Sequence, residues 1–460
     1  IGILSAANAL MHVRTSQGTI AWCIALVTFP WIAVPFYWIL GRNKFHGYLE
    51  TLRTAIVENV DLVAEAREAM SAHHGKFTKL DDPAEYTLDS LTLRRFTSGN
   101  KVELLIDGTA TFDAIFKAID GAKNYLLIQF FIIKDDELGG KMKSRLIARA
   151  RDGIRIHVLF DEIGTHALSR EYIEDLRNEG IEVSGFGTTR GPANRFQLNF
   201  RNHRKIVIAD GEVAFVGGHN VGDAYLGKSK KFGHWRDTHV RIEGPAVLGV
   251  QAVFVEDWFW ATRVVPQLNW SPRRVRGKNV NILPLETGPA DTLETCTLMF
   301  LHLINSARER LWIASPYFVP DESIASALQL AALRGVDVRI MIPDQPDHKM
   351  VYLAAFSYLE KMGATGVKIF RYVGGFLHQK VALVDHHLSV VGTANLDNRS
   401  FRLNFELSIA VSNREFALKV EKMLADDFTQ CRQVDGRDYT ERPAHFRFAV
   451  RVCRLLAPIL

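Results

Sequence analysis

The chain has 460 residues, of which 23% are charged and 47% hydrophobic, with a formal net charge of +5. This length allows two or three domains with a sizeable core. The composition excludes a disordered chain and a chain made wholly of membrane spans. The mild positive charge fits a surface that meets anionic lipid or nucleic acid, but it does not select a partner. The four cysteines have no Cys-x-x-Cys or zinc-like spacing, and we expect reduced thiols.

The N-terminal region is strongly apolar. Residues 15–41 contain no Asp, Glu, Lys or Arg. About 20 apolar residues are enough to cross a bilayer, so we predict a transmembrane span at about residues 19–40. Residues 1–11 are also uncharged and are interpreted as the tail of an earlier span, which makes residues 1–45 a transmembrane helical hairpin. The alternatives are a buried core helix and a removed signal peptide.

Basic residues follow this region at Arg42, Lys44 and Arg53. Under the positive-inside rule they favour a multi-pass membrane protein whose catalytic body is cytoplasmic, although Arg14 lies on the other side. Residues 46–99 are predicted to be a connector.

An α/β pattern occurs twice in the remaining chain. We predict one half at residues 100–262, a linker at 263–280 and a second half at 281–432. The expected strands of the two halves are 102–106, 125–133, 154–160, 311–315 and 336–342. The expected helices are 110–121, 141–151, 292–310 and 323–333.

The C-terminal tail, residues 433–460, ends in an amphipathic pattern. Arg447, Arg451 and Arg454 recur at helical spacing among apolar residues. This pattern is typical of a helix in a membrane interface. The alternative is a terminal helix packed on the domain.

One 18-residue motif is repeated in the two halves, 175 residues apart (378 minus 203). Both copies read His-x-Lys-x4-Asp-x6-Gly-small-x-Asn. The first copy contains His203, Lys205, Asp210, Gly218 and Asn220. The second copy contains His378, Lys380, Asp385, Thr393 and Asn395. Agreement over the whole frame indicates a duplicated domain with two half-sites.

The motif residues suit chemistry at an anionic phosphorus. Strand alternation is expected to place His203 and Lys205 on one face and Arg204 on the other. Two facing histidines supply a nucleophile and a proton donor for in-line displacement. Lysines, asparagines and the backbone near Gly218 can stabilise the charge on the phosphoryl oxygens. The pattern needs no cofactor, and no ligand-like spacing indicates a metal.

Two further carboxylates occupy matching places. Asp237 follows Asn220 by 17 residues, and Glu406 follows Asn395 by 11 residues; each begins a similar apolar-alternating run. A carboxylate that accepts from an imidazole N–H fixes the histidine tautomer. The alternative for both residues is a plain surface salt bridge.

The paired motifs resemble those of the phospholipase D superfamily, over about residues 100–432. Three further sequences are similar to those of its bacterial cardiolipin synthase branch: Ser315-Pro-Tyr-Phe-Val-Pro320, Asn395-Leu-Asp-Asn-Arg-Ser400 and Leu403-Asn-Phe-Glu406. The resemblance implies two pseudo-twofold-related α/β/α halves that form one active site. It also implies that two phosphatidylglycerols are condensed into cardiolipin and glycerol through a phosphohistidine intermediate.

The resemblance assigns one motif histidine as the nucleophile and the other as general acid and then base, and family habit favours His203 as the nucleophile. Asp210 and Asp385 are grouped with the catalytic motif, although in the family this aspartate is usually structural. The family usually has a hydroxyl residue after the motif glycine, which Thr393 provides and Gly218 does not.

Several functions compete with this interpretation. The first is a phospholipase D that uses water, or a transferase that uses another head-group alcohol. A nuclease is disfavoured because the apolar N-terminus indicates lipid and no aromatic-basic interleaving indicates nucleic acid. A catalytically inactive membrane scaffold is disfavoured by two complete motifs. The expected partners are phosphatidylglycerol, cardiolipin and the lipid bilayer, with homo-oligomerisation left open.

Overall fold

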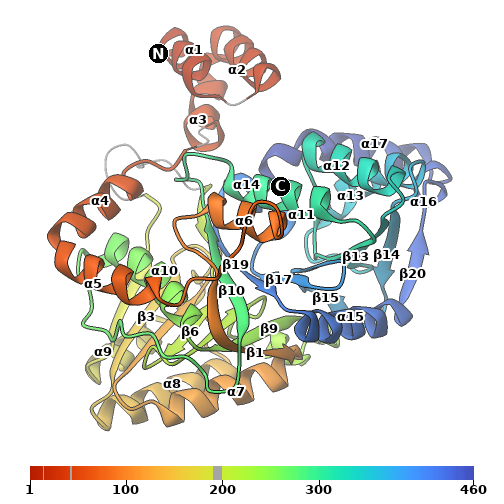
Figure 1. Ribbon diagram of the computed structural model, residues 1–460. Coiled ribbons are helices and arrows are strands. Elements are labelled where there is room, and N and C mark those ends of the chain that lie inside the picture. The colour runs from red at the N-terminus through yellow and green to blue at the C-terminus, as the bar shows by residue number, and fades with distance from the viewer. Residues whose placement is uncertain (14, 42–43, 190–198) are drawn as a thin grey trace.

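Two α/β halves lie side by side in the computed structural model, which describes residues 1–13, 15–41, 44–189 and 199–460 (Figure 1). The first half contains β1 (Thr97–Ile106), α7 (Asp107–Gly121), β2 (Tyr125–Phe130), α8 (Glu137–Arg151), β3 (Arg155–Asp161), α9 (Arg170–Asn178), β4 (Glu182–Phe186), β5 (Arg201–Asn202), β6 (Ile206–Ala209), β7 (Val213–Gly217), β8 (Trp235–Arg236), β9 (Thr238–Glu243) and α10 (Ala246–Thr262).

The second half repeats this order. It contains β10 (Val280–Thr287), α11 (Thr295–Ser306), β11 (Arg310–Ala314), β12 (Phe318–Val319), α12 (Glu322–Leu333), β13 (Asp337–Pro343), α13 (Lys349–Gly363), β14 (Lys368–Tyr372), β15 (Phe376–Leu377), β16 (Val381–Val384), β17 (Leu388–Gly392), β18 (Leu396–Asp397), α14 (Asn398–Arg402), β19 (Asn404–Ser412), α15 (Arg414–Thr429) and β20 (Cys431–Val434).

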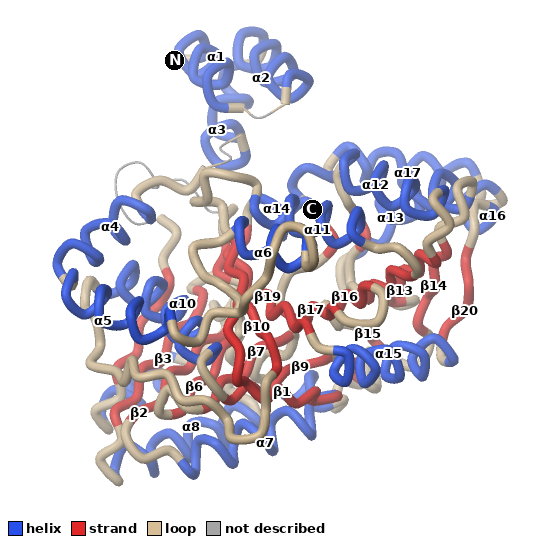
Figure 2. Tube along the Cα trace, in the orientation of Figure 1, coloured by secondary structure: helices blue, strands red, loops and turns tan. Residues whose placement is uncertain are grey.

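A single mixed sheet runs through both halves (Figure 2). Its centre is the antiparallel pair β1–β10. From β1 outward the order is β9, β7, β6, β2, β3, β4, and from β10 outward it is β19, β17, β16, β11, β13, β14. The two series match strand for strand. The halves are therefore related by a pseudo-twofold axis between β1 and β10, and equivalent positions can be read from the register.

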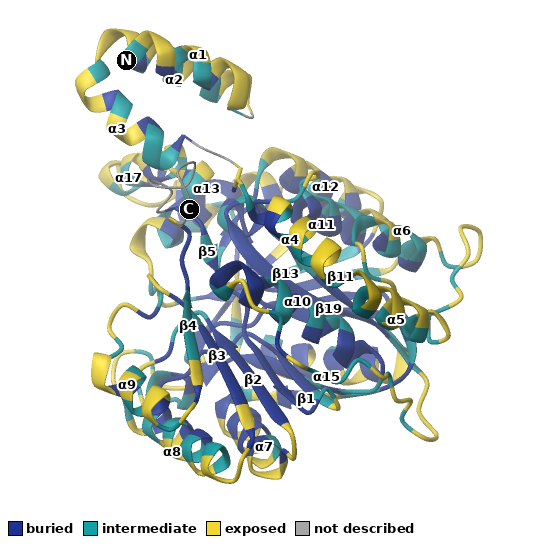
Figure 3. Ribbon diagram, turned by 90° about the vertical axis from the view of Figure 1, so that its left-hand side faces the viewer, coloured by how far each residue is buried: buried dark blue, intermediate teal, exposed yellow. Residues whose placement is uncertain are grey.

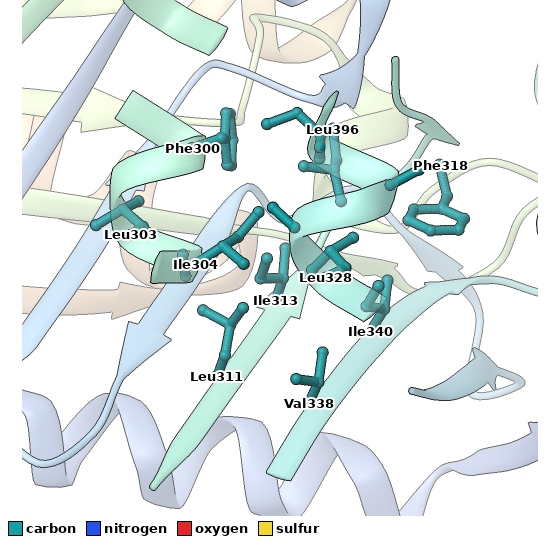
Figure 4. Packing of buried hydrophobic residues seen from close by; sticks show 14 of the residues in the cluster. Phe300, Leu303, Ile304, Leu311, Ile313, Phe318, Leu328, Val338, Ile340 and Leu396 are labelled. Atoms are coloured by element: carbon teal, nitrogen blue, oxygen red, sulfur yellow. The ribbon is translucent and has the colours of Figure 1, made fainter. Parts of the chain in front are cut away.

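Helices on both faces of the sheet account for its apolar strands. Every residue of β2, β6, β16 and β17 is buried, as expected for strands covered on both sides (Figure 3). In the second half, Leu311 and Ile313 of β11 pack with Ile304 of α11 and Leu328 of α12 (Figure 4). This rigid, apolar scaffold fixes the strand ends that carry the motifs.

The N-terminal helices stand apart from the body of the protein (Figure 1). They are α1 (Gly2–His12), α2 (Ser16–Thr28) and α3 (Pro30–Leu40). The sequence predicted one continuous span over residues 19–40, but Phe29 separates α2 from α3. The reason is Pro30, which lacks an N–H group and favours the first turn of a helix. Within the described ranges no helix is long and apolar enough to cross a membrane, so the predicted transmembrane hairpin is not confirmed.

The segment predicted as a connector is helical and partly embedded against both halves. It forms α4 (Tyr48–Glu58), α5 (Val60–Ser71) and α6 (Pro83–Leu91). Phe45 and Tyr48 are buried, and their rings lie 5.4 Å and 4.9 Å from the ring of Phe405 in β19. The chain that leads out of α3 is thus anchored beside a motif-bearing region.

The C-terminal tail forms α16 (Arg437–Thr440) and α17 (Ala444–Leu455). Val450 and Cys453 are buried, and Phe446 packs on Phe356 of α13 with 5.2 Å between ring centroids. The tail is therefore packed on the domain, while Phe448 and Leu455 remain exposed on its outer face.

The motif aspartates lie at hairpin turns, at the far end of the strand from each motif histidine. The Asp210 carboxylate accepts hydrogen bonds from the N–H groups of Lys123, Asn124 and Tyr125 at 2.7–2.9 Å. Asp385 accepts in the same way from the N–H groups of residues 308–310. Both aspartates have left-handed backbones, with φ of +56° and +49°. The prediction that groups them with the catalytic residues is therefore corrected: they hold the chain at the start of β2 and β11.

Replacing Asp210 should reduce stability. Asp210→Ala leaves three N–H groups without their acceptor, and we expect the free energy of unfolding to fall by about 1–3 kcal/mol. Thermal unfolding would detect a lower midpoint. Asp152→Ala is the control, because Asp152 makes an exposed ion pair with Arg149. An unchanged midpoint together with lost activity would contradict the structural role.

Candidate active site

Two short parallel strand pairs bring the motifs of both halves together. β5, just before His203, pairs with β19 of the second half, and β15, just before His378, pairs with β8 of the first half. The His203 N–H donates to the carbonyl of Phe405 at 2.9 Å, and the His378 N–H donates to the carbonyl of Arg236 at 2.8 Å. The sequence predicted strand structure at residues 203–205, but these residues lie between β5 and β6. Each motif histidine is thus held by backbone from the opposite half.

Each histidine also meets a carboxylate from the opposite half. His203 Nδ1 lies 2.9 Å from Glu406 Oε2, and His378 Nδ1 lies 2.7 Å from Asp237 Oδ2. Both carboxylates are completely buried. A carboxylate at Nδ1 holds the proton there and leaves Nε2 as the free nitrogen. The two carboxylates that the sequence singled out are therefore exchanged between the halves.

Glu406 has several other donors. It accepts from the Ser400 hydroxyl at 2.9 Å, from the Asn404 amide at 3.1 Å and from the Thr393 hydroxyl. Burial raises the pKa of Glu406, but His203, the Lys205 charge and the Thr393 hydroxyl together lower it below its ordinary value. Glu406 therefore remains an anion in the core. The sequence analysis quoted the segments containing Ser400 and Asn404 but gave neither residue a role.

Steric hindrance explains why position 218 is a glycine and not a residue with a side chain. The register places Gly217 opposite His239 and Gly392 opposite Ser408, so Gly218 corresponds to Thr393. A Cβ at Gly218 would lie 2.0 Å from Asp237 Oδ1. The first half therefore lacks the hydroxyl because the Asp237 carboxylate occupies that space.

The two lysines share one electrostatic environment with the two histidines. Burial lowers the pKa of Lys205 to about 7 and that of Lys380 to about 8, and the Lys380 charge lowers the pKa of Lys205 further. Lys380 Nζ lies 3.1 Å from His378 Nε2. The charges of Lys205 and His203 also act on His378. The two motifs therefore form one site, in which the buried ammonium groups of Lys205 and Lys380 can bind an anion.

Aromatic rings keep the histidines away from water. The Phe131 ring lies 5.0 Å from that of His203, and the Trp235 ring lies 5.2 Å from that of His378. Burial lowers the pKa of His203 to about 4, although Glu406 opposes this change, and it lowers the pKa of His378 well below its ordinary value. Both imidazoles are therefore neutral at pH 7. No sequence pattern pointed to these rings.

The motif asparagines have unequal partners. Asn220 accepts from the Ile132 N–H at 3.1 Å and donates to the Tyr225 hydroxyl at 3.0 Å. The Oδ1 atom of Asn395 has no hydrogen-bond partner among the described residues, although it is buried. The site thus contains every predicted residue except Asp210 and Asp385.

Buried ion pairs lie next to the residues that hold both histidines. Arg204 pairs with Asp257 of α10 at 2.8 Å, and Arg236 pairs with Asp427 of α15 at 2.7 Å. Asp257 also accepts from the Tyr48 hydroxyl at 2.7 Å. Because all these groups are paired, the charges can be buried at low cost. These ion pairs are not predictable from the sequence, since single aspartates in helices give no pattern of their own.

The arrangement supports nucleophilic and acid–base chemistry on a phosphodiester. Each neutral imidazole has an unprotonated Nε2, which in His378 lies 3.1 Å from Lys380 Nζ, and two ammonium groups beside them can stabilise a phosphoryl oxygen. An incoming phosphate also raises the pKa of a nearby imidazole, which allows one histidine to carry a proton. The same site can therefore hold a nucleophile and an acid.

Comparison with known proteins identifies the family. A family model described as "Cardiolipin synthase, PLD-like domain" matches residues 115–258 and 300–428, and a phospholipase D-nuclease N-terminal model matches residues 1–42. Cardiolipin synthase A of Pseudomonas putida (strain GB-1) is 46% identical over 466 residues, which cover 100% of this chain and 96% of that protein. Cardiolipin synthase A of Pseudomonas fluorescens (strain SBW25) is 45% identical over 467 residues, with the same coverage.

Solved structures agree on the fold. The phosphatidylserine synthase of Haemophilus influenzae Rd KW20 superposes with a TM-score of 0.63 at 16% identity, and the match covers 82% of this chain and 99% of that one. The resemblance expected from the motifs is confirmed by the full-length identity and the matched domain. The chain belongs to the family of cardiolipin synthases with a phospholipase D-like domain.

Proposed function

We propose that this chain condenses two phosphatidylglycerols into cardiolipin and glycerol. The observation that carries the proposal is the exchange of carboxylates between the halves, because it gives two motif histidines the same tautomer in one lysine-lined site. The full-length similarity to cardiolipin synthase A supports the choice of lipid substrate.

The proposed reaction has two displacements at phosphorus. Nε2 of one histidine attacks the phosphorus of the first phosphatidylglycerol, and the P–O bond to its head-group glycerol breaks. The other histidine gives its proton to that glycerol oxygen and becomes a base. It then takes a proton from a hydroxyl of the second phosphatidylglycerol, whose oxygen attacks phosphorus and breaks the P–N bond. We assign His203 as the nucleophile, following the habit of the family.

Charge stabilisation falls to the other motif residues. Lys205 and Lys380 would bind the phosphoryl oxygens, and Asn220 and Asn395 would donate to them. The buried Oδ1 of Asn395, unpartnered among the described residues, is an acceptor and therefore fits a hydroxyl group of the head-group glycerol and not the phosphate.

We further propose that α1–α3 attach the protein to the inner membrane of a bacterium, with the catalytic body on the cytoplasmic side. Ile3, Phe29 and Trp31 are 66–90% exposed, which suits contact with lipid better than with water. Residues 1–42 match a separate N-terminal family model, which supports a role for this region that is distinct from catalysis.

Removing either motif histidine should abolish the reaction. With phosphatidylglycerol vesicles, the unaltered protein should form cardiolipin and glycerol in equal amounts, measured by lipid mass spectrometry. His203→Ala and His378→Ala should each lower turnover at least about 10³-fold, since each loses a nucleophile or a proton donor. His157→Ala, a buried histidine that packs on Trp258, is the control. Phosphatidic acid without cardiolipin would indicate a hydrolase instead.

The exchanged carboxylates should control turnover. Glu406→Gln and Asp237→Asn leave the histidine tautomer unfixed, and we expect turnover about 10²–10⁴-fold lower while the thermal midpoint changes little. Glu286→Gln is the matched control, because Glu286 pairs with Arg94 outside the motifs. Turnover within twofold of the unaltered protein for both motif variants would remove these carboxylates from the mechanism.

The buried lysines should set an alkaline limit. Lys205 and Lys380, with pKa values of about 7 and 8, are charged below these values and lose charge as pH rises through them. We therefore expect kcat/KM for phosphatidylglycerol to fall between pH 7 and pH 9, as the attraction for phosphate is lost. Lys205→Arg should move the fall to higher pH, and the exposed Lys141→Arg should not. A profile that rises over this range would contradict the lysine role.

A further inference from the structure

Arg371 of β14 is a buried cation that makes no ion pair within the described part of the chain. It is completely buried, and its Nε and Nη2 atoms have no hydrogen-bond partner among the described residues. Only Nη1 donates, to the carbonyl of Pro343 at 3.2 Å. The guanidinium lies between the rings of Tyr352 and Phe356, 4.5 Å and 4.4 Å from their centroids. Burying an unpaired charge is costly, and the other buried arginines of the site region are paired with aspartates.

A pocket borders this guanidinium. Its lining comes from the segments that follow β11 and β13, from Arg371 and from the first turns of α13. The carboxyl ends of parallel strands are where ligands bind in α/β sheets. The N–H of His348, the residue before the 15-residue helix α13, donates to the Asp347 carboxylate at 2.7 Å, so the start of this helix already has an anionic partner. The unpaired guanidinium is therefore the group at this pocket that favours an anion.

The pocket adjoins the candidate active site. Its residue Asp347 acts electrostatically on both His378 and Lys380. Tyr317, also in the lining, donates to Asp347 at 2.6 Å. Two residues before it, the Ser315 hydroxyl accepts from the N–H of Leu396, which follows the motif residue Asn395. A ligand in this pocket would therefore lie beside the reacting groups.

The cation belongs to one half only. In β14, Arg371 is opposite Ile342 of β13; in the equivalent pair of the first half, Gly185 is opposite Phe160. The strand order makes Gly185 the counterpart of Arg371. Arg371 is thus an asymmetric feature in a nearly symmetric site. An enzyme that joins two identical lipids needs such a difference, because one lipid is the donor and the other the acceptor.

We propose that this pocket binds the phosphodiester head group of the acceptor phospholipid. Arg371 would hold its phosphate, while Tyr317 and Asp347, at the start of α13, would bind its glycerol hydroxyls. The Asp347 carboxylate disfavours an anion at its own position but accepts well from hydroxyl groups, which orients the head group with its phosphate toward Arg371. The free hydroxyl is then next to His378. This inference rests on the proposed function.

The test separates the two half-reactions. Labelled free glycerol can re-enter phosphatidylglycerol from the histidine intermediate, and this exchange requires no acceptor phosphate. Arg371→Gln should lower cardiolipin formation from phosphatidylglycerol vesicles at least tenfold and leave glycerol exchange within twofold. Arg339→Gln is the matched control: Arg339 also lies over two rings, Trp312 and Phe428, but outside the pocket. Both of its rates should stay within twofold.

An equal loss of both reactions in Arg371→Gln would overturn the inference, because the arginine would then be needed only for folding. An unaltered protein that forms no cardiolipin would instead refute the proposed function. The two failures are therefore distinct.

A competition experiment does not depend on how much of the variant folds. Free glycerol and glycerol 3-phosphate are offered together as acceptors, and the ratio of their two phosphatidyl products is measured in one sample. The unaltered protein should prefer glycerol 3-phosphate, and Arg371→Gln should reduce this preference at least tenfold. An unchanged ratio would overturn the inference.

Discussion

The exchange of carboxylates between the halves is the interaction on which the rest of the site depends. Glu406 of the second half fixes His203 of the first, and Asp237 of the first half fixes His378 of the second. Neither half contains a complete histidine–carboxylate pair of its own. The functional unit is therefore the whole duplicated body, and the central strands β1 and β10 position the catalytic groups as well as joining the halves.

The charged groups of this site can be buried because each has hydrogen-bond or ion-pair partners. The histidines rest on carboxylates, the carboxylates accept from several donors, and behind them Arg204 and Arg236 are paired with helix aspartates. Burial lowers the pKa values of the two lysines, although the Asp237 and Glu406 carboxylates oppose this change. An anionic substrate would add negative charge beside the lysines and favour their charged forms.

The sequence predicted much of this arrangement, for identifiable reasons. The repeated motif spacing gave the duplication, the strand and helix order and most of the site residues, and the equivalent runs after Asn220 and Asn395 singled out Asp237 and Glu406. It could not reveal the exchange between halves, because which half supplies a partner depends on how β5 and β15 pair across the molecule.

Other misses also have physical causes. Asp210 and Asp385 are as regular in the motif as the histidines, yet their regularity reflects a turn that needs an acceptor for three N–H groups. The apolar run at residues 19–40 gave a single span because composition alone does not register the break before Pro30. Arg371 could not be predicted as a site residue because a lone arginine in a strand forms no sequence pattern. Its unusual state appears only in the structure, where Nε and Nη2 have no hydrogen-bond partner among the described residues.

The aromatic wedge formed by Phe45 and Tyr48 has a practical consequence. These residues belong by sequence to the exit from the N-terminal helices, but they fill the core beside Phe405, and the Tyr48 hydroxyl completes the shell around Asp257. The border between α1–α3 and the body of the protein therefore lies ahead of Phe45. A version shortened at its N-terminus would have to retain both residues, because their removal would leave a cavity beside Phe405, the residue before Glu406.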